Sequence, residues 1–320
     1  MAMVKLNAAF KDYLWGGTKL KVEYGKKTDL DIVAESWELS THPDGQSVVA
    51  SGPEAGKTLS EYIDSLGEDC LGTKGKEFEF FPILIKLIDA KQPLSIQVHP
   101  DNEYALRVEK EYGKTEMWYI LDCEPGATLY FGVNKEISKE EFACRIQNHT
   151  LLDVLKKVPV HKGDVFFIQA GTIHAIGEGI QICEIQQNSN TTYRVYDYGR
   201  VGKDGKPREL HIEKAIDVSN LTPIESNFKP CGPTIKDENA TTSMLATCDY
   251  FTTFETTLKG TTVIPVDEES FGSIVMIEGS ATLDDGTTRL EVKKGDSVFI
   301  TANNEDVTVT GDCQWIYSRV

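Results

Sequence analysis

The stretch FPILIKLIDAKQPLSIQVHP, residues 81–100, decides the fold because a long apolar run ends in two polar side chains. Gln97 and His99 stand two positions apart in the final QVHP. Side chains at positions i and i+2 of a strand point to the same face, so both groups enter one interior. An amide oxygen and an imidazole nitrogen are both metal donors. The stretch therefore predicts a strand that carries two metal ligands.

Two further segments complete a ligand set. Glu116 lies in the apolar stretch KTEMWYI, and His174 lies in QAGTIHAIG. Taken singly, a Glu at the start of a strand is usually solvated, and a His beside Gly and Thr usually belongs to a turn. Taken together, Gln97, His99, Glu116 and His174 supply one amide, two imidazoles and one carboxylate from three segments. That set suits zinc, with room for water or substrate to enlarge the coordination shell.

The rest of the chain is typical of a mainly β protein with a few inserted helices. Short strands separated by turn residues favour a sandwich or a barrel. KGDVFFIQA (162–170) and KGDSVFITA (294–302) repeat a tight turn followed by a buried strand. This repeat predicts two similar β-barrel units, one with a working site and one without. The strand-like runs are 93–99, 116–122, 127–132, 164–169, 180–187, 251–258, 261–265, 273–278, 288–292, 297–301 and 306–310.

Helix starts are readable from their capping residues. Thr58 with Glu61 and Ser138 with Glu141 have the spacing of a capping box. Thr150 is expected to cap a helix over LLDVLKK. Two more helices are expected, one that starts at Asp101 and ends at Gly113 and one over HIEKAIDV (211–218).

The positions of the histidines divide the chain. The six histidines stand at 42, 99, 149, 161, 174 and 211, so a His-based site belongs to the first two thirds. We expect a zinc-binding catalytic domain over 1–225 and a structural β domain over 236–320. The segment 219–236 is rich in Pro, Ser and Asn and is expected to link them.

Composition excludes several classes of partner. A net charge of −17 disfavours nucleic acid and anionic membranes. No stretch approaches the about 20 apolar residues of a membrane helix, and the N-terminus lacks the apolar core of an export signal. The seven cysteines show no CxxC spacing, which favours free thiols in a reducing cytoplasm.

Taken in order, the motifs resemble those of the type I mannose-6-phosphate isomerases, in the short form of Gram-positive bacteria. The motifs are QPLSIQVHP, KTEMWYI, QAGTIHAIG, NTTYRVYDYGR, LWGG, AESWELS and RELHIEKAIDV. The resemblance implies a cupin fold, a double-stranded β-helix jelly roll with a zinc ion inside, followed by a second, degenerate cupin-like domain. It also implies interconversion of mannose 6-phosphate and fructose 6-phosphate through an enediol.

The resemblance also assigns residues. The zinc ligands of the family fall on the four donors already named. Its catalytic arginine falls on Arg194 and its catalytic lysine on Lys114, while Lys86 and Trp15 fall on substrate-binding positions. Two positions depart from the family pattern: Gln169 replaces a proline and Asn190 replaces an acidic residue.

The structural alternatives are a lysine that complements a helix C-terminus for Lys114, aromatic stacking for Arg194 and core packing for Trp15. Lys86 lies in an apolar strand, where an unpaired lysine is costly, so it either reaches solvent or meets an anion.

These residue types suit aldose–ketose isomerisation. A zinc ion with an open position polarises sugar oxygens, and the guanidinium of Arg194 stabilises negative charge. The sequence leaves open which group takes the carbon proton: zinc-bound hydroxide, Lys114 or an unassigned carboxylate. Two alternatives are an iron dioxygenase of the cupin type, against which Gln97 as a ligand counts, and a non-catalytic sugar-binding cupin. The sequence does not indicate an oligomeric state.

Overall fold

The fold is mainly β, as predicted, in a computed structural model that describes residues 3–202 and 205–320. The chain forms two compact units. Unit 1 comprises Met1–Asp12, Thr18–Leu87 and Pro230–Val320, and unit 2 comprises Tyr13–Gly17 and Ile88–Lys229. Strand β5 (Ile83–Ala90) begins in unit 1 and ends in unit 2. The domain limits proposed from the sequence, 1–225 and 236–320, stay a prediction.

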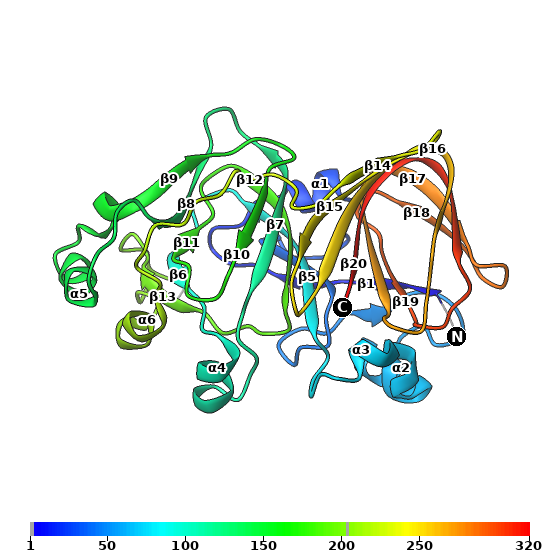
Figure 1. Cartoon of the computed structure of the whole chain (residues 1–320), viewed down its shortest axis with the longest axis horizontal. Helices are drawn as coiled ribbons and strands as arrows, with labels where there is room; N and C mark the ends of the chain where they lie inside the picture. The colour runs from blue at the N-terminus through cyan, green and yellow to red at the C-terminus, as the bar shows by residue number, and fades with distance from the viewer. Residues whose placement is uncertain (1–2, 203–204) are drawn as a thin grey trace. The chain divides into compact units, whose positions relative to one another are not determined.

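Unit 1 is built around one antiparallel sheet with the order β14-β15-β16-β20-β17-β19-β1-β4, to which β18 adds by pairing with β17 (Figure 1). Its first strand pairs with a strand near the end of the chain, because Met3 lies opposite Ile300. The elements are β1 (Met3–Asn7), β2 (Ala9–Lys11), α1 (Lys19–Glu23), β3 (Glu35–Leu39), β4 (Val48–Val49), α2 (Leu59–Leu66), η1 (Glu68–Leu71), α3 (Gly72–Gly75), β14 (Thr234–Lys236), β15 (Ala240–Thr247), β16 (Thr252–Ile264), β17 (Gly272–Asp284), β18 (Arg289–Lys293), β19 (Ser297–Ile300) and β20 (Val307–Arg319).

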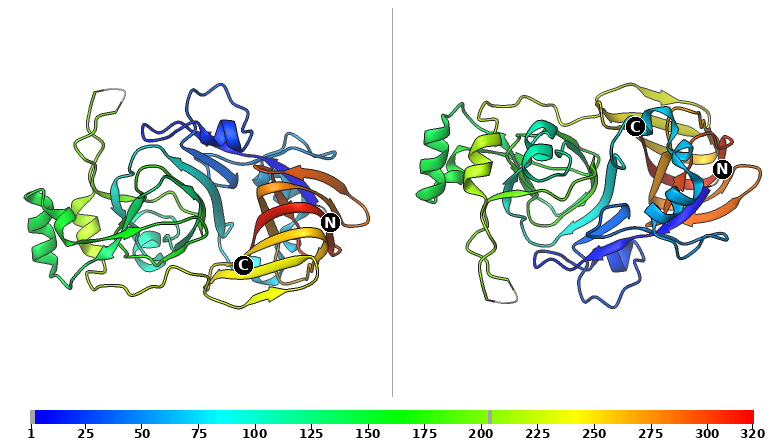
Figure 2. Two further views of the ribbon diagram at one scale, coloured as in Figure 1. Left: turned by 90° about the horizontal axis from the view of Figure 1, so that it is seen from above. Right: turned by 90° about the horizontal axis from the view of Figure 1, so that it is seen from below.

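Unit 2 carries a five-stranded sheet, β13-β6-β11-β8-β9, and the antiparallel strands β10, β7 and β12. Seen from above, these strands run around a ring, as in a barrel (Figure 2). The elements are β6 (Ile96–Val98), α4 (Asn102–Val108), β7 (Glu116–Cys123), β8 (Thr128–Val133), α5 (Lys139–Gln147), η2 (Leu151–Val154), β9 (Leu155–Pro159), β10 (Val165–Ile168), β11 (His174–Ala175), β12 (Ile180–Gln187), β13 (Tyr193–Tyr196) and α6 (Ile212–Val218).

Alternation along β6 decides which side chains of unit 2 face the interior. Ile96 and Val98 join an apolar cluster that also contains Phe142 of α5 and Ala215 of α6. These two helices therefore cover one face of the sheet. Because successive side chains of a strand point to opposite faces, Gln97 points to the other face.

The helix starts predicted at Thr58, Ser138 and Asp101 are confirmed. Thr58 accepts a hydrogen bond from the Glu61 amide, and the Glu61 carboxylate accepts one from the Thr58 amide, which is a complete capping box. Ser138 accepts from the Glu141 amide at 3.1 Å, and Asp101 caps α4. None of the helices in the described ranges is long and apolar enough to cross a membrane.

The prediction of a helix over 151–157 was wrong. Only Leu151–Val154 forms a single 3₁₀ turn, without a side-chain cap from Thr150, and Leu155–Pro159 is strand β9. Leu129 of β8 pairs with Val158, and the side chains of Leu155 and Val158 are buried. Pairing with a strand distant in sequence thus outweighed local helix propensity. The helix expected to run from 101 to 113 also ends early, at Val108.

The repeated Lys-Gly-Asp turn has the same structure in both units. Gly163 and Gly295 have φ of 86° and 87°, the left-handed region that favours glycine. In unit 2 the Gly163 amide donates to the Ile120 carbonyl oxygen of β7, and β7 pairs with β10, the strand after the turn. In unit 1 the Gly295 amide donates to the Met276 carbonyl oxygen of β17, and β17 pairs with β19, the strand after the turn. The two turns are therefore equivalent, in agreement with the repeat seen in the sequence.

This equivalence locates the counterpart of Glu116 in unit 1. In unit 2, Glu116 of β7 lies opposite Ile168, five residues after Gly163. In unit 1, the residue opposite Ile300, five residues after Gly295, is Gly272. A Cβ added to Gly272 would come within 2.6 Å of the Tyr317 ring. At this position unit 1 has no carboxylate, and an aromatic ring occupies the space.

Candidate metal centre

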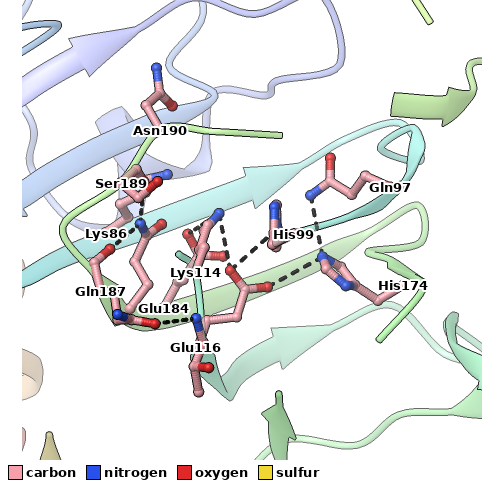
Figure 3. A network of polar contacts seen from close by, with 12 residues as sticks. Lys86, Gln97, His99, Lys114, Glu116, His174, Glu184, Gln187, Ser189 and Asn190 are labelled. Carbon is pink, nitrogen blue, oxygen red and sulfur yellow. Dashed lines mark hydrogen bonds and ion pairs between the residues drawn. The ribbon is translucent and has the colours of Figure 1, made fainter. Parts of the chain in front are cut away.

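Three separated segments of unit 2 bring the four predicted ligands together. Gln97 lies in β6 and His99 directly follows it, Glu116 is the first residue of β7 and His174 the first of β11. His174 lies directly opposite Gln97 in the antiparallel pair β11–β6. Figure 3 shows the Glu116 carboxylate between the two imidazole rings.

The donor atoms lie close to one another and away from solvent. His99 Nε2 is 3.6 Å from Glu116 Oε2, and His174 Nε2 is 3.3 Å from Glu116 Oε1. The Gln97 amide nitrogen is 3.4 Å from His174 Nε2, and rotating the amide by half a turn would place its oxygen there. His99, Glu116 and His174 are at most 1% exposed.

Backbone carbonyls fix the orientation of both rings. His99 Nδ1 is 3.0 Å from the Thr191 carbonyl oxygen, and His174 Nδ1 is 2.8 Å from that of Thr172. An imidazole that donates from Nδ1 keeps its lone pair on Nε2, the atom that faces Glu116 in both cases. Burial lowers the pKa of His174 to about 4, so this ring is neutral near pH 7 and able to bind a metal.

The residues fit a divalent metal ion. Ligands about 2.1 Å from a tetrahedral zinc ion are separated from one another by about 3.4 Å. The three separations of 3.3, 3.4 and 3.6 Å are of this size. The ligand atoms of His99, Glu116 and His174 all lie within 4.8 Å of one another. This donor set of nitrogen and oxygen atoms forms a candidate metal centre.

An ammonium group and a second carboxylate adjoin the centre. Lys114 Nζ is 3.0 Å from Glu116 Oε2 and 3.8 Å from Glu184 Oε1. Trp118 Nε1 donates to Glu184 Oε2 at 2.8 Å. All four side chains are buried. Sequence reasoning missed Glu184, although a glutamate inside the apolar strand IQICEIQQ is a signal of a paired or functional carboxylate.

Arg194 lies in β13 and its backbone is opposite Gln97 in the pair β13–β6. Its Nη1 donates to the Glu209 carbonyl oxygen at 2.8 Å. Its Nε is buried and makes no hydrogen bond within the described part of the chain. Burial is the main cause that lowers the pKa of the Arg194 guanidinium, and the positive charge of the nearby Arg208 lowers it further.

Comparison with known proteins decides the family. The phosphomannose isomerase type I catalytic domain matches residues 3–124, and the mannose-6-phosphate isomerase cupin domain matches residues 240–320. The mannose-6-phosphate isomerase ManA of Bacillus subtilis is 38% identical over 313 residues, 97% of this chain and 96% of that protein. The chain belongs to the type I phosphomannose isomerase family.

Two more relatives of this family agree. A mannose-6-phosphate isomerase of Streptococcus mutans is 35% identical over 96% of this chain and 94% of its own length. The crystal structure of a Bacillus subtilis mannose 6-phosphate isomerase superimposes with a TM-score of 0.93, at 35% identity and with all of both chains covered. The predicted cupin fold and the predicted membership of the phosphomannose isomerases are thus confirmed.

Lys86 and Trp15, the two substrate-binding residues expected from the phosphomannose isomerase pattern, make an ion pair and aromatic contacts. Lys86 lies in the part of β5 that belongs to unit 1, with its Nζ 3.5 Å from Glu35 Oε2 and 5.0 Å from the Trp37 ring centre. Trp15 belongs to unit 2, is 3% exposed and packs 5.7 Å from the Tyr13 ring. The substrate-binding roles of both stay predictions.

Proposed function

We propose that this chain interconverts mannose 6-phosphate and fructose 6-phosphate and that the metal held by Gln97, His99, Glu116 and His174 is zinc. One observation carries the proposal: in a phosphomannose isomerase chain, the buried His99, Glu116 and His174 and the half-buried Gln97 converge beside the ammonium group of Lys114. The iron dioxygenase and the non-catalytic sugar-binding cupin considered as alternatives lie outside this family.

Zinc agrees best with the donor chemistry. Two neutral imidazoles, one neutral amide and one carboxylate leave a dication with a net charge of about +1. Dioxygen-activating iron sites use histidine and carboxylate with several open positions, and an amide ligand does not match that pattern. When bound, the zinc ion would polarise the oxygens of the substrate and leave the neighbouring C–H bond more acidic.

Lys114 and Glu184 are the groups that we propose to handle protons. The reaction moves one proton between two carbons and another between two oxygens. A proton carrier must lie within hydrogen-bond reach of the reacting atoms and next to a group that can hold its charge. Lys114 Nζ is 3.0 Å from a proposed ligand and 3.8 Å from Glu184, so we assign the transfers to Lys114, with Glu184 holding its ammonium form.

Arg194 is the proposed cation for the anionic parts of the substrate. A half-buried guanidinium with one hydrogen bond to a carbonyl retains further donors for a phosphate or an enediolate. Lys86 and Trp15 are retained as proposed substrate-binding residues on the family pattern alone.

The proposed partner is a small sugar phosphate, which needs neither nucleic acid nor a membrane surface. We also propose a cytoplasmic location, where such phosphates are made and consumed. The seven free cysteines are compatible with a reducing compartment.

A coupled assay with mannose 6-phosphate tests the activity, and metal analysis of the purified protein tests the ion. We expect turnover that a chelator abolishes and that zinc restores, with about one zinc per chain. Arg194→Ala should retain zinc and lose about 10²–10³-fold in kcat. Arg289→Ala, at a side chain that is 68% exposed, is the matched control and should leave turnover unchanged. Iron content with oxygen consumption, or full activity of Arg194→Ala, would contradict the proposal.

A further inference from the structure

The ring of His99 is held by a loop of irregular structure. Its Nδ1 meets the Thr191 carbonyl oxygen at 3.0 Å, and residues 188–192 between β12 and β13 form neither helix nor strand. For His174 the corresponding carbonyl belongs to Thr172, only two residues away in the chain. The orientation of His99 thus depends on what fixes a loop 92 residues distant in sequence.

Glu111 fixes that loop through three consecutive residues. Its Oε2 accepts hydrogen bonds from Ser189 Oγ at 3.2 Å, the Asn190 amide at 3.2 Å and Thr191 Oγ1 at 3.0 Å. A carboxylate is an acceptor-only group, and hydrogen bonds to a charged acceptor are stronger than neutral ones. One oxygen atom therefore gathers the residue that carries the Thr191 carbonyl and the two before it.

The segment that carries Glu111 is itself anchored. Lys110 has φ of 64°, which turns the chain after α4. Glu109, on the other side of this turn, accepts from Tyr193 Oη at 2.8 Å and from Lys214 Nζ at 2.6 Å. A short distance on, the Gly113 amide donates to Asn102 Oδ1. The carboxylate of Glu111 is thus presented from a fixed backbone.

We propose that Glu111 is a positioning residue of the metal centre. It holds the Thr191 carbonyl oxygen in place to accept a hydrogen bond from His99 Nδ1, and so keeps Nε2 of that ring directed at the metal. This inference rests on the proposed metal centre. Partners of ligating histidines usually contribute 10- to 100-fold to metal affinity. Glu111 is one hydrogen bond further from the His99 ring than such a partner, so its removal should lower the metal affinity about 10-fold.

The test is the zinc affinity of the metal-free protein, measured by competition with a chromophoric chelator. Wild type is compared with Glu111→Ala, with the isosteric Glu111→Gln, and with Glu103→Ala as a control at an exposed glutamate of α4. We expect a dissociation constant about 10-fold higher for Glu111→Ala, a smaller increase for Glu111→Gln and none for Glu103→Ala. Glu111→Gln keeps the test valid should the alanine variant fold poorly.

A second measurement distinguishes a specific effect on the His99 ring from a general loss of rigidity at the metal centre. In the Co²⁺-loaded protein, the Nδ1 protons of the two ligating histidines should give separate shifted NMR signals. Glu111→Gln should speed the solvent exchange of the His99 proton and leave that of His174 unchanged, because Thr172 does not contact Glu111.

Unchanged zinc affinity in both Glu111 variants, or equal acceleration of both protons, would overturn the inference while leaving the metal centre intact. If wild type binds no zinc, the metal centre itself fails and this inference fails with it.

Discussion

Lowering the pH should destabilise the metal-free protein through His174 in particular. This ring is fully buried, and burial lowers its pKa from 6.5 to about 4. The unfolded chain, in which the ring is solvated, binds a proton near pH 6.5, while the folded protein resists protonation until about pH 4. The contribution of the neutral ring to stability is therefore complete above pH 6.5 and is lost as the pH falls toward 4.

The magnitude follows from the two pKa values. A shift from 6.5 to about 4 corresponds to about 3 kcal/mol once both states are protonated. Between about pH 7 and about pH 5, the part lost is about 2 kcal/mol. Carboxylates elsewhere titrate in the same range, so the comparison must be made against a variant that differs only at this ring.

The assay is urea unfolding of the chelator-treated protein at the two pH values, for wild type and for His174→Gln. Wild type should lose about 2 kcal/mol more than the variant between pH 7 and pH 5. His174→Gln is the control for wild type, because it retains every other titrating group. Equal pH dependence in the two proteins would refute the reasoning, since it would mean that the ring is solvated or already charged in the folded state.

Two further predictions concern the frame of the fold. Gly163→Ala should cost about 1 kcal/mol, since its φ of 86° is unfavourable but an added Cβ comes no closer than 4.0 Å to other atoms. At the equivalent Gly295→Ala a backbone oxygen lies 2.0 Å from the Cβ, so unfolding in urea should show a loss of about 3 kcal/mol or more; equal losses would contradict this. Lys26 Nζ is 2.6 Å from the Glu38 carboxylate and its side chain is 8% exposed. Glu38→Gln removes this buried counter-charge and should lower the free energy of unfolding, measured in urea or by heating, by about 3–5 kcal/mol. Glu269→Gln breaks an ion pair with Lys74 in which both side chains are 52% exposed, and a 3.9 Å contact with Arg319, which keeps its pair with Asp267. It should cost less than about 1 kcal/mol, and a similar effect of both changes would show that burial does not set the cost.

Much of the fold was predictable because its signals are local. The period-two alternation of QPLSIQVHP placed Gln97 and His99 on one side of β6, and the structure agrees, with Ile96 and Val98 on the other. The Thr58–Glu61 capping box and the two Lys-Gly-Asp turns depend on only a few consecutive residues. The residues that form these features are all close together in the sequence, so the sequence shows them directly.

The features that the sequence did not predict depend on contacts between segments that are distant in the chain. LLDVLKK (151–157) has a plausible helical pattern, yet Leu155–Pro159 pairs with β8, and no local signal predicts that pairing. IQICEIQQ marks Glu184 as a buried carboxylate, but its partners Lys114 and Trp118 lie about 70 positions earlier in the chain and cannot be read from that segment. Each of these outcomes depends on strand register, which the sequence of one segment does not contain.

By itself the sequence determined the inventory of the centre: two imidazoles, an amide and a carboxylate at strand ends, with a lysine two positions before the carboxylate. Tertiary structure alone decided the distances between them and the direction of each ring, because Thr191 and Thr172 offer backbone carbonyls that any residue type would carry. A metal ligand is chosen by the chemistry of its side chain, which is written in the sequence. Its orientation is set by neighbouring backbone atoms, whose positions exist only once the strands have paired.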